Sequence, residues 1–252
     1  MPGHREIDVP AFFVRARLDG EEPLLFLPSS YMTYDVSMTP AMPASPPSRT
    51  EFALATIKQR ILSGQLAPGQ ALVESELAQE FSMSKTPVRE ALKTLETSGL
   101  VVVQPYIGVR VRSLSQQDAV AIYETRLLLE PEAVRRSVER GVDVAPARAA
   151  LAEAEQAIDA PTRRLANRAF HASLWAQADN PVLTGILEGL RDQTALAAVG
   201  TWSRDPSWRG EADEHERILS AAASADADRA AELTRRHIAG FLDRLRERGA
   251  NT

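Results

Sequence analysis

Three of the four histidines of this chain lie in its C-terminal half, at His171, His215 and His237. Asn167 precedes His171 by four residues, so on a helix the two side chains share one face. Three imidazoles that converge on one point bind a divalent transition metal and leave coordination positions open, and an amide oxygen can join them. The alternative is that each histidine is an independent core or surface residue. The spacing leaves both interpretations open, because the three histidines fall on separate expected helices.

A second set of residues has the chemistry for reading DNA. Lys85, Arg89 and Lys93 repeat every fourth residue, and Ser84 and Thr86 lie beside the first of them. On a helix in the major groove, Arg89 can bond guanine through two donors and Lys85 can contact guanine or phosphate. Ser84 and Thr86 suit phosphate oxygens. The alternative is the solvated face of an ordinary helix, which three basic residues alone do not exclude.

Three short helices are expected to position these donors. The first begins near Glu51 and stops at Gly64, and the second buries Leu77 and Phe81. The third starts after Ser84, a good N-cap, with Pro87 in its first turn. Its apolar residues recur at i, i+3, i+4 and i+7, as Val88, Ala91, Leu92 and Leu95.

A β-hairpin follows the third helix, which stops at Ser98-Gly99. Residues 100–103 are a β-branched run, 104–108 form a turn, and Val109 and Val111 then alternate with arginines. Three helices and a hairpin, in this order, predict a winged helix-turn-helix. Gly108 at the tip of the wing would allow close approach to the phosphate backbone.

From Ser113 onward the pattern is helical throughout, so the fold class is mainly α. Junctions rich in Gly, Asp and Pro separate the helices. The expected helices are 115–140 (broken at Pro131), 146–158, 162–178, 181–200, 207–223 and 226–248. The predicted organisation is residues 49–112 for DNA binding and 113–250 as an all-helical domain. Residues 1–48, rich in Pro and Ser at their end, are expected to be a disordered tail or an over-long start preceding Met38 or Met42.

The charges are unevenly spread over a chain with a formal net charge of −5. Residues 49–112 carry 8 basic against 6 acidic side chains, including all three lysines, whereas 113–252 carry 18 against 22. A basic module attached to an acidic one suits a sequence-specific regulator. The chain has no cysteine, which excludes thiolate metal sites and disulfides and fits a cytoplasmic protein. No apolar run approaches the ~20 residues of a membrane helix, so no membrane partner is expected.

Five short sequence motifs of the N-terminal region resemble the DNA-binding domain of the GntR family. They are Leu66-Ala-Pro-Gly69, Leu72-Val-Glu-Ser-Glu-Leu-Ala78, Ser84-Lys-Thr-Pro-Val-Arg-Glu-Ala-Leu92, Leu95-Glu-Thr-Ser-Gly-Leu-Val101 and Pro105-Tyr-Ile-Gly-Val109. The resemblance covers about residues 50–112. It implies that Ser84, Lys85, Thr86, Arg89 and Gly108 touch operator DNA. Ser75 stands where many members have a basic residue, which removes one contact.

The C-terminal half resembles the FCD effector domain of the FadR subfamily over roughly 115–245. The motifs are Tyr123-Glu-Thr-Arg-Leu-Leu-Leu-Glu130, Asn167-Arg-Ala-Phe-His-Ala-Ser-Leu174, Asp179-Asn-Pro181, Glu214-His-Glu-Arg-Ile-Leu219 and His237-Ile. This resemblance implies an antiparallel bundle of six or seven helices. It also implies a divalent metal, zinc first and nickel or another as alternatives, held by Asn167, His171, His215 and His237. Asparagine replaces a common aspartate, and its neutral oxygen is a weaker ligand.

The function implied is an effector-responsive transcription regulator that acts as a homodimer on palindromic operator DNA, most often a repressor released by its effector. Effectors of the class are small carboxylates, including organic and sugar acids. Arg126 is the candidate partner for the acid, the alternative being an ion pair with Glu130 four residues on. An architectural DNA-binding dimer with a structural metal is the second reading. A metal hydrolase is the third, but the chain lacks His-Glu-x-x-His and Gly-x-Ser-x-Gly motifs, so no enzyme is expected.

Overall fold

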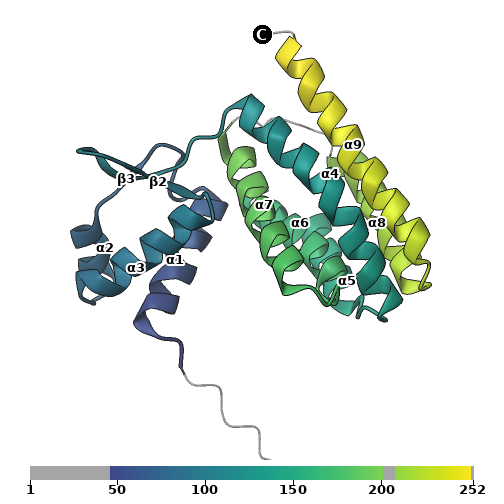
Figure 1. The fold of residues 1–252 in the computed structure, drawn as a ribbon, viewed down its shortest axis with the longest axis horizontal. Coiled ribbons are helices and arrows are strands. Elements are labelled where there is room, and N and C mark those ends of the chain that lie inside the picture. The colour runs from purple at the N-terminus through teal and green to yellow at the C-terminus, as the bar shows by residue number, and fades with distance from the viewer. Residues whose placement is uncertain (1–45, 201–207, 251–252) are drawn as a thin grey trace, which may run out of the picture. The chain divides into compact units, whose positions relative to one another are not determined.

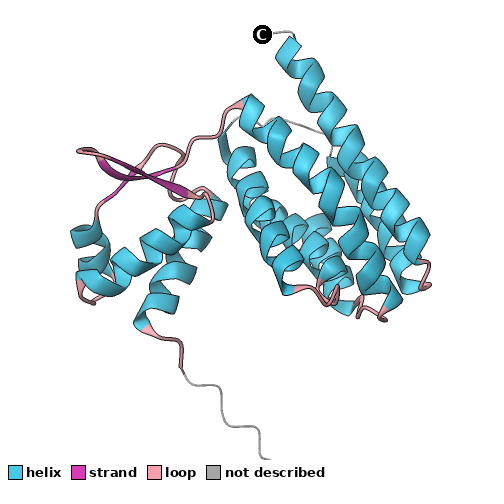
Figure 2. Cartoon of the chain, viewed as in Figure 1, coloured by secondary structure: helices cyan, strands magenta, loops and turns pink. Residues whose placement is uncertain are grey.

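The structure is a computed structural model that describes residues 46–200 and 208–250. The expected tail or over-long start therefore lies almost wholly outside the described residues. Within those residues the elements are helices apart from one small sheet (Figures 1 and 2). Among the described residues no helix is long and apolar enough to cross a membrane.

The first three helices and the sheet form a winged helix-turn-helix. The helices are α1 (Arg49–Ser63), α2 (Glu74–Glu80) and α3 (Lys85–Thr97), and the strands are β1 (Ala71–Leu72), β2 (Val101–Gln104) and β3 (Gly108–Val111). The sheet is antiparallel with the order β1-β3-β2, and Val101 pairs with Val111 across the hairpin. The winged-helix prediction is therefore confirmed, although sequence analysis missed the two-residue strand β1.

Local chemistry sets the ends of α1. Ser48 and Glu51 form a reciprocal capping box at its start, in which the Ser48 hydroxyl accepts from the Glu51 amide and the Glu51 carboxylate accepts from the Ser48 amide. Gly64 ends the helix at φ +85°, a left-handed conformation in which a Cβ would be strained. Between these ends, Ile57 and Ile61 are fully buried in one core with Leu92 and Leu95 of α3.

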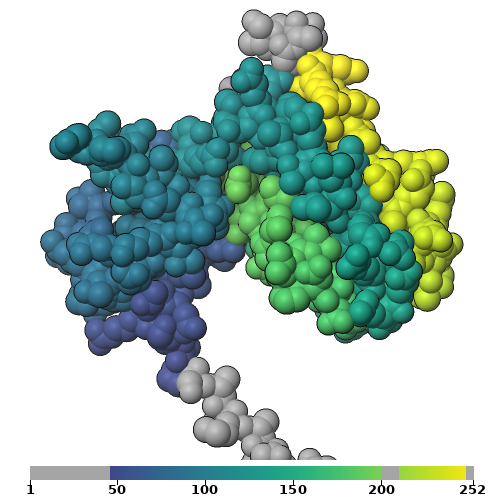
Figure 3. All heavy atoms as spheres, in the orientation of Figure 1, coloured from purple at the N-terminus to yellow at the C-terminus, as the bar shows by residue number. Residues whose placement is uncertain are grey.

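Six helices make up the remaining described residues (Figure 2). They are α4 (Gln116–Glu139), α5 (Ala145–Gln156), α6 (Ala160–Trp175), α7 (Pro181–Gly200), α8 (Trp208–Ala223) and α9 (Ala227–Ala250). Helices α4 and α9 lie side by side along their lengths (Figures 1 and 3), with Tyr123 and Leu242 among the buried residues between them. The second core includes Phe170, Leu174, Leu187 and Ile218 from α6, α7 and α8.

The expected break at Pro131 is wrong, because α4 is one helix of 24 residues with Pro131 inside it. A proline in a helix interior costs about 3 kcal/mol through the lost amide donor and a backbone clash. Pro131 is buried, and Ala133 and Val134 that follow it belong to the core. Tertiary packing of this segment offsets the local cost, which a reading of local propensity cannot anticipate.

Candidate functional sites

The three histidines converge in the structure. His171 on α6, His215 on α8 and His237 on α9 are buried, and one ring nitrogen from each lies within 4.8 Å of the other two. The Nε2 atoms of His171 and His215 are 3.1 Å apart, and those of His215 and His237 are 3.3 Å apart. Two nitrogens bound to one tetrahedral zinc are roughly 3.3 Å apart, given bonds of about 2.0–2.1 Å. The spacing of these nitrogens therefore fits a shared metal ion.

Two glutamates set the chemistry of the outer ring nitrogens. The Nδ1 atom of His171 lies 3.0 Å from Glu130 Oε1, and that of His237 lies 2.7 Å from Glu214 Oε2. A carboxylate beside Nδ1 favours the tautomer with the proton there, so the Nε2 lone pairs of both rings would face the cluster. For His237 this contact is a hydrogen bond, whereas the contact of His171 Nδ1 with Glu130 has the distance but not the geometry of one. Lone pairs directed at one point repel one another unless a proton or a cation lies between them. A carboxylate behind a histidine ligand is the usual second shell of a protein metal site.

Asn167 lies one helical turn before His171 on α6 and lines the same cavity. Its Oδ1 atom is buried and accepts no hydrogen bond in the described part of the chain. A buried amide oxygen without a donor costs free energy unless a ligand satisfies it. This acceptor without a donor is the second observation that fits a bound cation. It belongs to Asn167, the fourth metal ligand expected from the sequence.

Burial controls the protonation of the cluster. Burial lowers the pKa of His171 well below its usual value, with Arg191 adding to the effect, and burial and then His237 do the same to the pKa of His215. Both rings are therefore neutral at pH 7, the form that binds metal.

A pH dependence of stability follows from these depressed values. In the unfolded chain the histidines titrate near pH 6.5, so below about that pH the unfolded state binds protons that the folded state does not. Below that pH the free energy of unfolding of the metal-free protein is expected to fall by roughly 1–1.5 kcal/mol per pH unit for each of His171 and His215. Urea unfolding in a chelator between pH 7.5 and 5.5 measures this slope. His171→Gln should give a shallower slope than wild type, and an equal slope would contradict the assignment.

Behind the histidines, Glu130 is shared by two buried arginines. Its carboxylate accepts from Arg126 Nε at 2.9 Å and from Arg191, and the three side chains are 0–4% exposed. Burial alone would raise the pKa of Glu130, but Arg126, Arg191 and His171 hold it well below its usual value. Burial, and after it the charge of Arg126, lower the pKa of Arg191 to about 9. Arg126 therefore forms the ion pair that was the alternative to its effector role, and it also lines the cavity.

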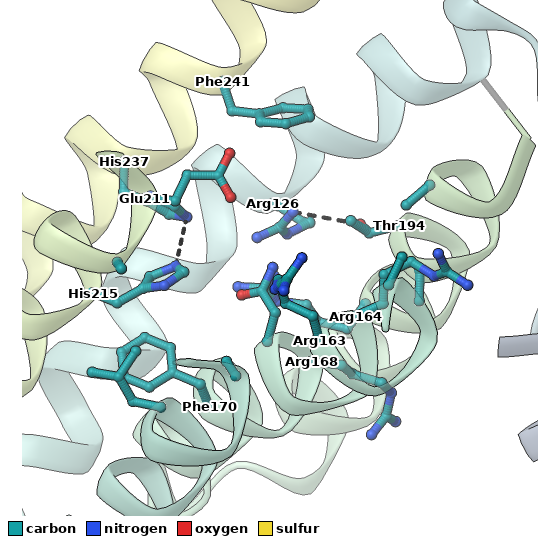
Figure 4. Close-up of a pocket in the computed structure, with 18 of the residues that line it drawn as sticks. Arg126, Arg163, Arg164, Arg168, Phe170, Thr194, Glu211, His215, His237 and Phe241 are labelled. Atoms are coloured by element: carbon teal, nitrogen blue, oxygen red, sulfur yellow. Dashed lines mark hydrogen bonds between the residues drawn. The ribbon is translucent and has the colours of Figure 1, made fainter. Parts of the chain in front are cut away.

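A cavity of about 210 Å³ opens beside the histidines. Figure 4 shows His215 and His237 at one side of it, with Arg126, Arg163 and Arg164 among the other lining residues. Arg168 and Arg191 also line it, against the two acidic side chains Glu155 and Glu211. Drug-sized ligands occupy pockets of about 300–1,000 Å³, so this cavity suits a smaller molecule. Its basic lining favours an anion.

The expected DNA contacts lie together on the winged helix. Ser84 is the N-cap of α3, and Ser84, Lys85, Thr86 and Arg89 are exposed on its first turns. The opposite face buries Val88, Ala91, Leu92 and Leu95, as predicted. Gly108 has φ +98°, a backbone conformation that favours glycine. A Cβ built there would meet no other atom within 4 Å, so the tip of the wing has open space for a DNA backbone. Ser75 on α2 is exposed, at the position that lacks the basic residue.

Arg89 is already engaged in the free protein. Its guanidinium contacts both carboxylate oxygens of Glu74 on α2, at 2.7–3.1 Å. This hydrogen bond, with the charges of Arg89 and nearby lysines, lowers the pKa of Glu74. The fork that would read guanine is thus held in a bidentate pair, and Glu74 must be exchanged for a base edge on binding.

Sequence analysis missed the buried pair Arg191 and Asp192 and found only one of the partners of Glu130. Glu130 was noted only as a local partner for Arg126, whereas it also reaches His171 and Arg191. Arg191 and Asp192 are 3% and 1% exposed on α7, next to core residues such as Leu187 and Leu196. An adjacent acid and base inside an otherwise apolar helix was the available signal, because charged residues are seldom fully buried without partners.

Comparison with known proteins agrees with the two-part fold and with a DNA-binding regulator. Residues 49–111 match the bacterial regulatory proteins of the gntR family, and residues 121–240 match the FCD domain. The chain is 30% identical to the Nta operon transcriptional regulator of Aminobacter aminovorans, over 76% of this chain and 92% of that protein. It is also 30% identical to the transcriptional repressor GlaR of Escherichia coli, over 72% of this chain and 89% of that protein.

Among solved structures, E. coli McbR/YncC superposes with a TM-score of 0.69 at 23% identity, covering 81% of this chain and 99% of that one. This likeness shows the fold. The relatives and the family are transcription regulators, not enzymes. The chain belongs to the GntR family of DNA-binding transcription regulators, with an FCD domain following its winged helix-turn-helix.

Proposed function

We propose that this regulator is a homodimeric repressor whose helical half binds a small organic or sugar acid at a metal ion. The observation that carries the proposal is the convergence of three histidine Nε2 atoms at the edge of a cavity lined with arginines. His171, His215 and His237 would hold the metal, and Asn167 Oδ1 would complete its protein ligands. The metal would supply a Lewis-acid site for a carboxylate oxygen.

The DNA-binding part of the proposal assigns residues 49–112 to operator recognition and 113–250 to effector binding and dimerisation. Arg89 would read guanine, Lys85 guanine or phosphate, and Ser84 and Thr86 phosphate oxygens. Gly108 would bring the wing close to the backbone. Two copies would place two α3 helices in successive major grooves of a palindrome. The repressor sense rests on relatives such as GlaR, which is named a repressor.

The acid would act by shifting populations. A ligand that binds one arrangement of the two DNA-binding domains better than another moves the equilibrium toward it. Arg126 lines the cavity and would contact the acid while keeping its ion pair with Glu130.

Thermal melts test the effector proposal. Wild type and His171→Ala, metal-free or loaded with zinc or nickel, would be melted with a panel of small organic and sugar acids. A ligand that binds only the folded state adds roughly 2.7 kcal/mol at a hundredfold excess over its Kd. We expect at least one acid to raise the Tm of metal-loaded wild type and not of His171→Ala. Arg148→Ala, an exposed change on α5, is the control.

The alternative function is an architectural DNA-binding dimer in which the metal is purely structural. In that case metal alone raises the Tm, no acid adds to it, and operator affinity does not respond to small molecules. If neither metal nor the His171→Ala change matters, the metal site is wrong.

Asn167→Asp is expected to tighten metal binding by about tenfold. A carboxylate adds a full negative charge to a site whose fourth ligand is now a neutral amide oxygen, and a divalent cation binds a charged oxygen more strongly than a neutral one. Isothermal titration with zinc at pH 7.5 measures the change, and Asn167→Ala should bind more weakly than wild type. Equal affinities in the three proteins would show that residue 167 is not a ligand.

A further inference from the structure

Arg164 connects the proposed effector cavity to the DNA-binding half. It lies on α6, three residues before Asn167, and is one of the residues that line the cavity. Its Nη2 donates to the backbone carbonyl of Ser63 at 3.0 Å. Ser63 is the last residue of α1, where carbonyl oxygens have no partner within the helix. One guanidinium therefore contributes to the cavity wall and also caps the C-terminus of α1.

Arg164 forms no ion pair in the described residues, although the charge of Asp159 acts on it from a longer distance. In the described parts of the chain, no carboxylate lies within salt-bridge distance of it, and its Nε is buried without a hydrogen-bond partner. Burial lowers its pKa. By contrast, Arg126 and Arg191 share Glu130, and Arg168 pairs with Asp192 at 2.6 Å. A half-buried cation whose hydrogen bond goes to a neutral carbonyl is a site where an added anion can bind.

A second connection runs from the same wall to α1. Lys58 of α1 lies 2.5 Å from Asp192 of α7, and Asp192 also accepts from Arg168, which lines the cavity. Helix α1 in turn buries Ile57 and Ile61 in the core that holds α3. A displacement of the α1 C-terminus would therefore reach the helix that carries Arg89.

We propose that the effector carries two anionic groups, and is called a dianion below for that reason, and that Arg164 binds the second group and releases the Ser63 carbonyl when it does so. The inference rests on the proposed function, in which the first acid group binds at the histidine end of the cavity. A carboxylate or phosphate adds a full opposite charge and can accept two hydrogen bonds from the guanidinium, so it displaces the neutral Ser63 carbonyl. Arg164 is then both the specificity-determining residue and the residue through which occupancy reaches α1.

Pairs of acids that differ in one anionic group distinguish the contribution of the second group to binding from that of the first. Gluconate carries one carboxylate, glucarate carries a second one on the same carbon chain, and 6-phosphogluconate carries a phosphate there. Butyrate and succinate form a second pair without hydroxyls. Binding to zinc-loaded protein would be measured by isothermal titration for wild type, Arg164→Gln and Arg164→Lys. Arg148→Gln, on the exposed face of α5, is the matched control.

We expect wild type to bind the dianion of at least one pair about tenfold or more tightly than its monoanion. Arg164→Gln should bring the dianion down to the affinity of the monoanion and leave the monoanion unchanged, with Arg164→Lys in between. Whichever of glucarate and 6-phosphogluconate binds better identifies the second group as carboxylate or phosphate. Equal binding of monoanion and dianion, or an equal loss of both in Arg164→Gln, would overturn the inference while the proposed function stands.

Release of operator DNA by the dianion is a measurement that would not change if Arg164 had only a structural role. An operator duplex would first be selected from a random library with the wild-type protein. Each variant would then be bound to this duplex, and the amount of DNA released would be measured as the dianion is added. We expect release from wild type and Arg148→Gln, and at least tenfold less sensitivity to the dianion in Arg164→Gln. Release that is unaltered in Arg164→Gln would overturn the coupling role. If no acid of either pair binds the zinc-loaded wild type, the proposed function and this inference fall together.

Discussion

Replacing Glu130 with glutamine is expected to lower the free energy of unfolding by roughly 3–5 kcal/mol. The carboxylate is fully buried and bonds Arg126 and Arg191, which are 1% and 3% exposed. Without it, two guanidinium groups remain in the interior with no counter-charge, and the desolvation cost of each is no longer offset. For a chain of this size the Tm should fall by about 10 °C. Thermal and urea unfolding of the metal-free protein measure both quantities.

Glu188→Gln is the matched control for this change, since Glu188 is exposed on α7 and the same atoms are replaced. A second variant, Arg126→Met combined with Glu130→Gln, should recover part of the loss because one uncompensated charge is removed with the carboxylate. A fall no larger than that of Glu188→Gln would contradict the role of Glu130. The single variant should also bind zinc about tenfold more weakly, because the ring of His171 loses the negative charge that lies 3.0 Å from its Nδ1.

The part of the fold that follows local rules could be predicted from the sequence. Apolar spacing placed the four buried residues on one face of α3, and Gly64 marked the end of α1 as a left-handed cap. The two errors have one cause. Helix α4 continues through Pro131, and the short strand Ala71–Leu72 pairs with β3. In both places contacts between residues distant in sequence outweigh local propensity. A strand of two residues carries no alternation from which to predict it.

The histidine site shows a similar division. Residue type identified His171, His215 and His237, and helix periodicity placed Asn167 beside the first. Their convergence depends on how α6, α8 and α9 pack, which spacing along the chain does not determine. Glu130 is the clearest case: its bond to Arg126 spans four residues and is visible in the sequence, but its contacts with His171 and Arg191 span 41 and 61 residues. Long-range polar partners of this kind require the structure.

Arg89→Ala is expected to weaken operator binding by roughly 1–3 kcal/mol, which is about 5- to 150-fold. The side chain is exposed near the start of α3, and its guanidinium already adopts a forked, bidentate contact with Glu74. The same fork matches O6 and N7 of guanine, so truncation removes two hydrogen bonds to one base. Fluorescence anisotropy at fixed salt, with the selected operator and a scrambled duplex, measures the loss and its specificity.

The two duplexes distinguish base reading from a general basic surface. If Arg89 reads a base, its removal should reduce operator affinity far more than affinity for scrambled DNA, and Arg89→Lys should recover little because lysine lacks the fork. Lys93→Ala is the control on the same face, one turn further along α3 and paired with Glu90. It should change both duplexes by similar, smaller factors. An equal loss on both duplexes for Arg89→Ala would make Arg89 a phosphate contact, and specificity would then have to come from Lys85 or from the wing.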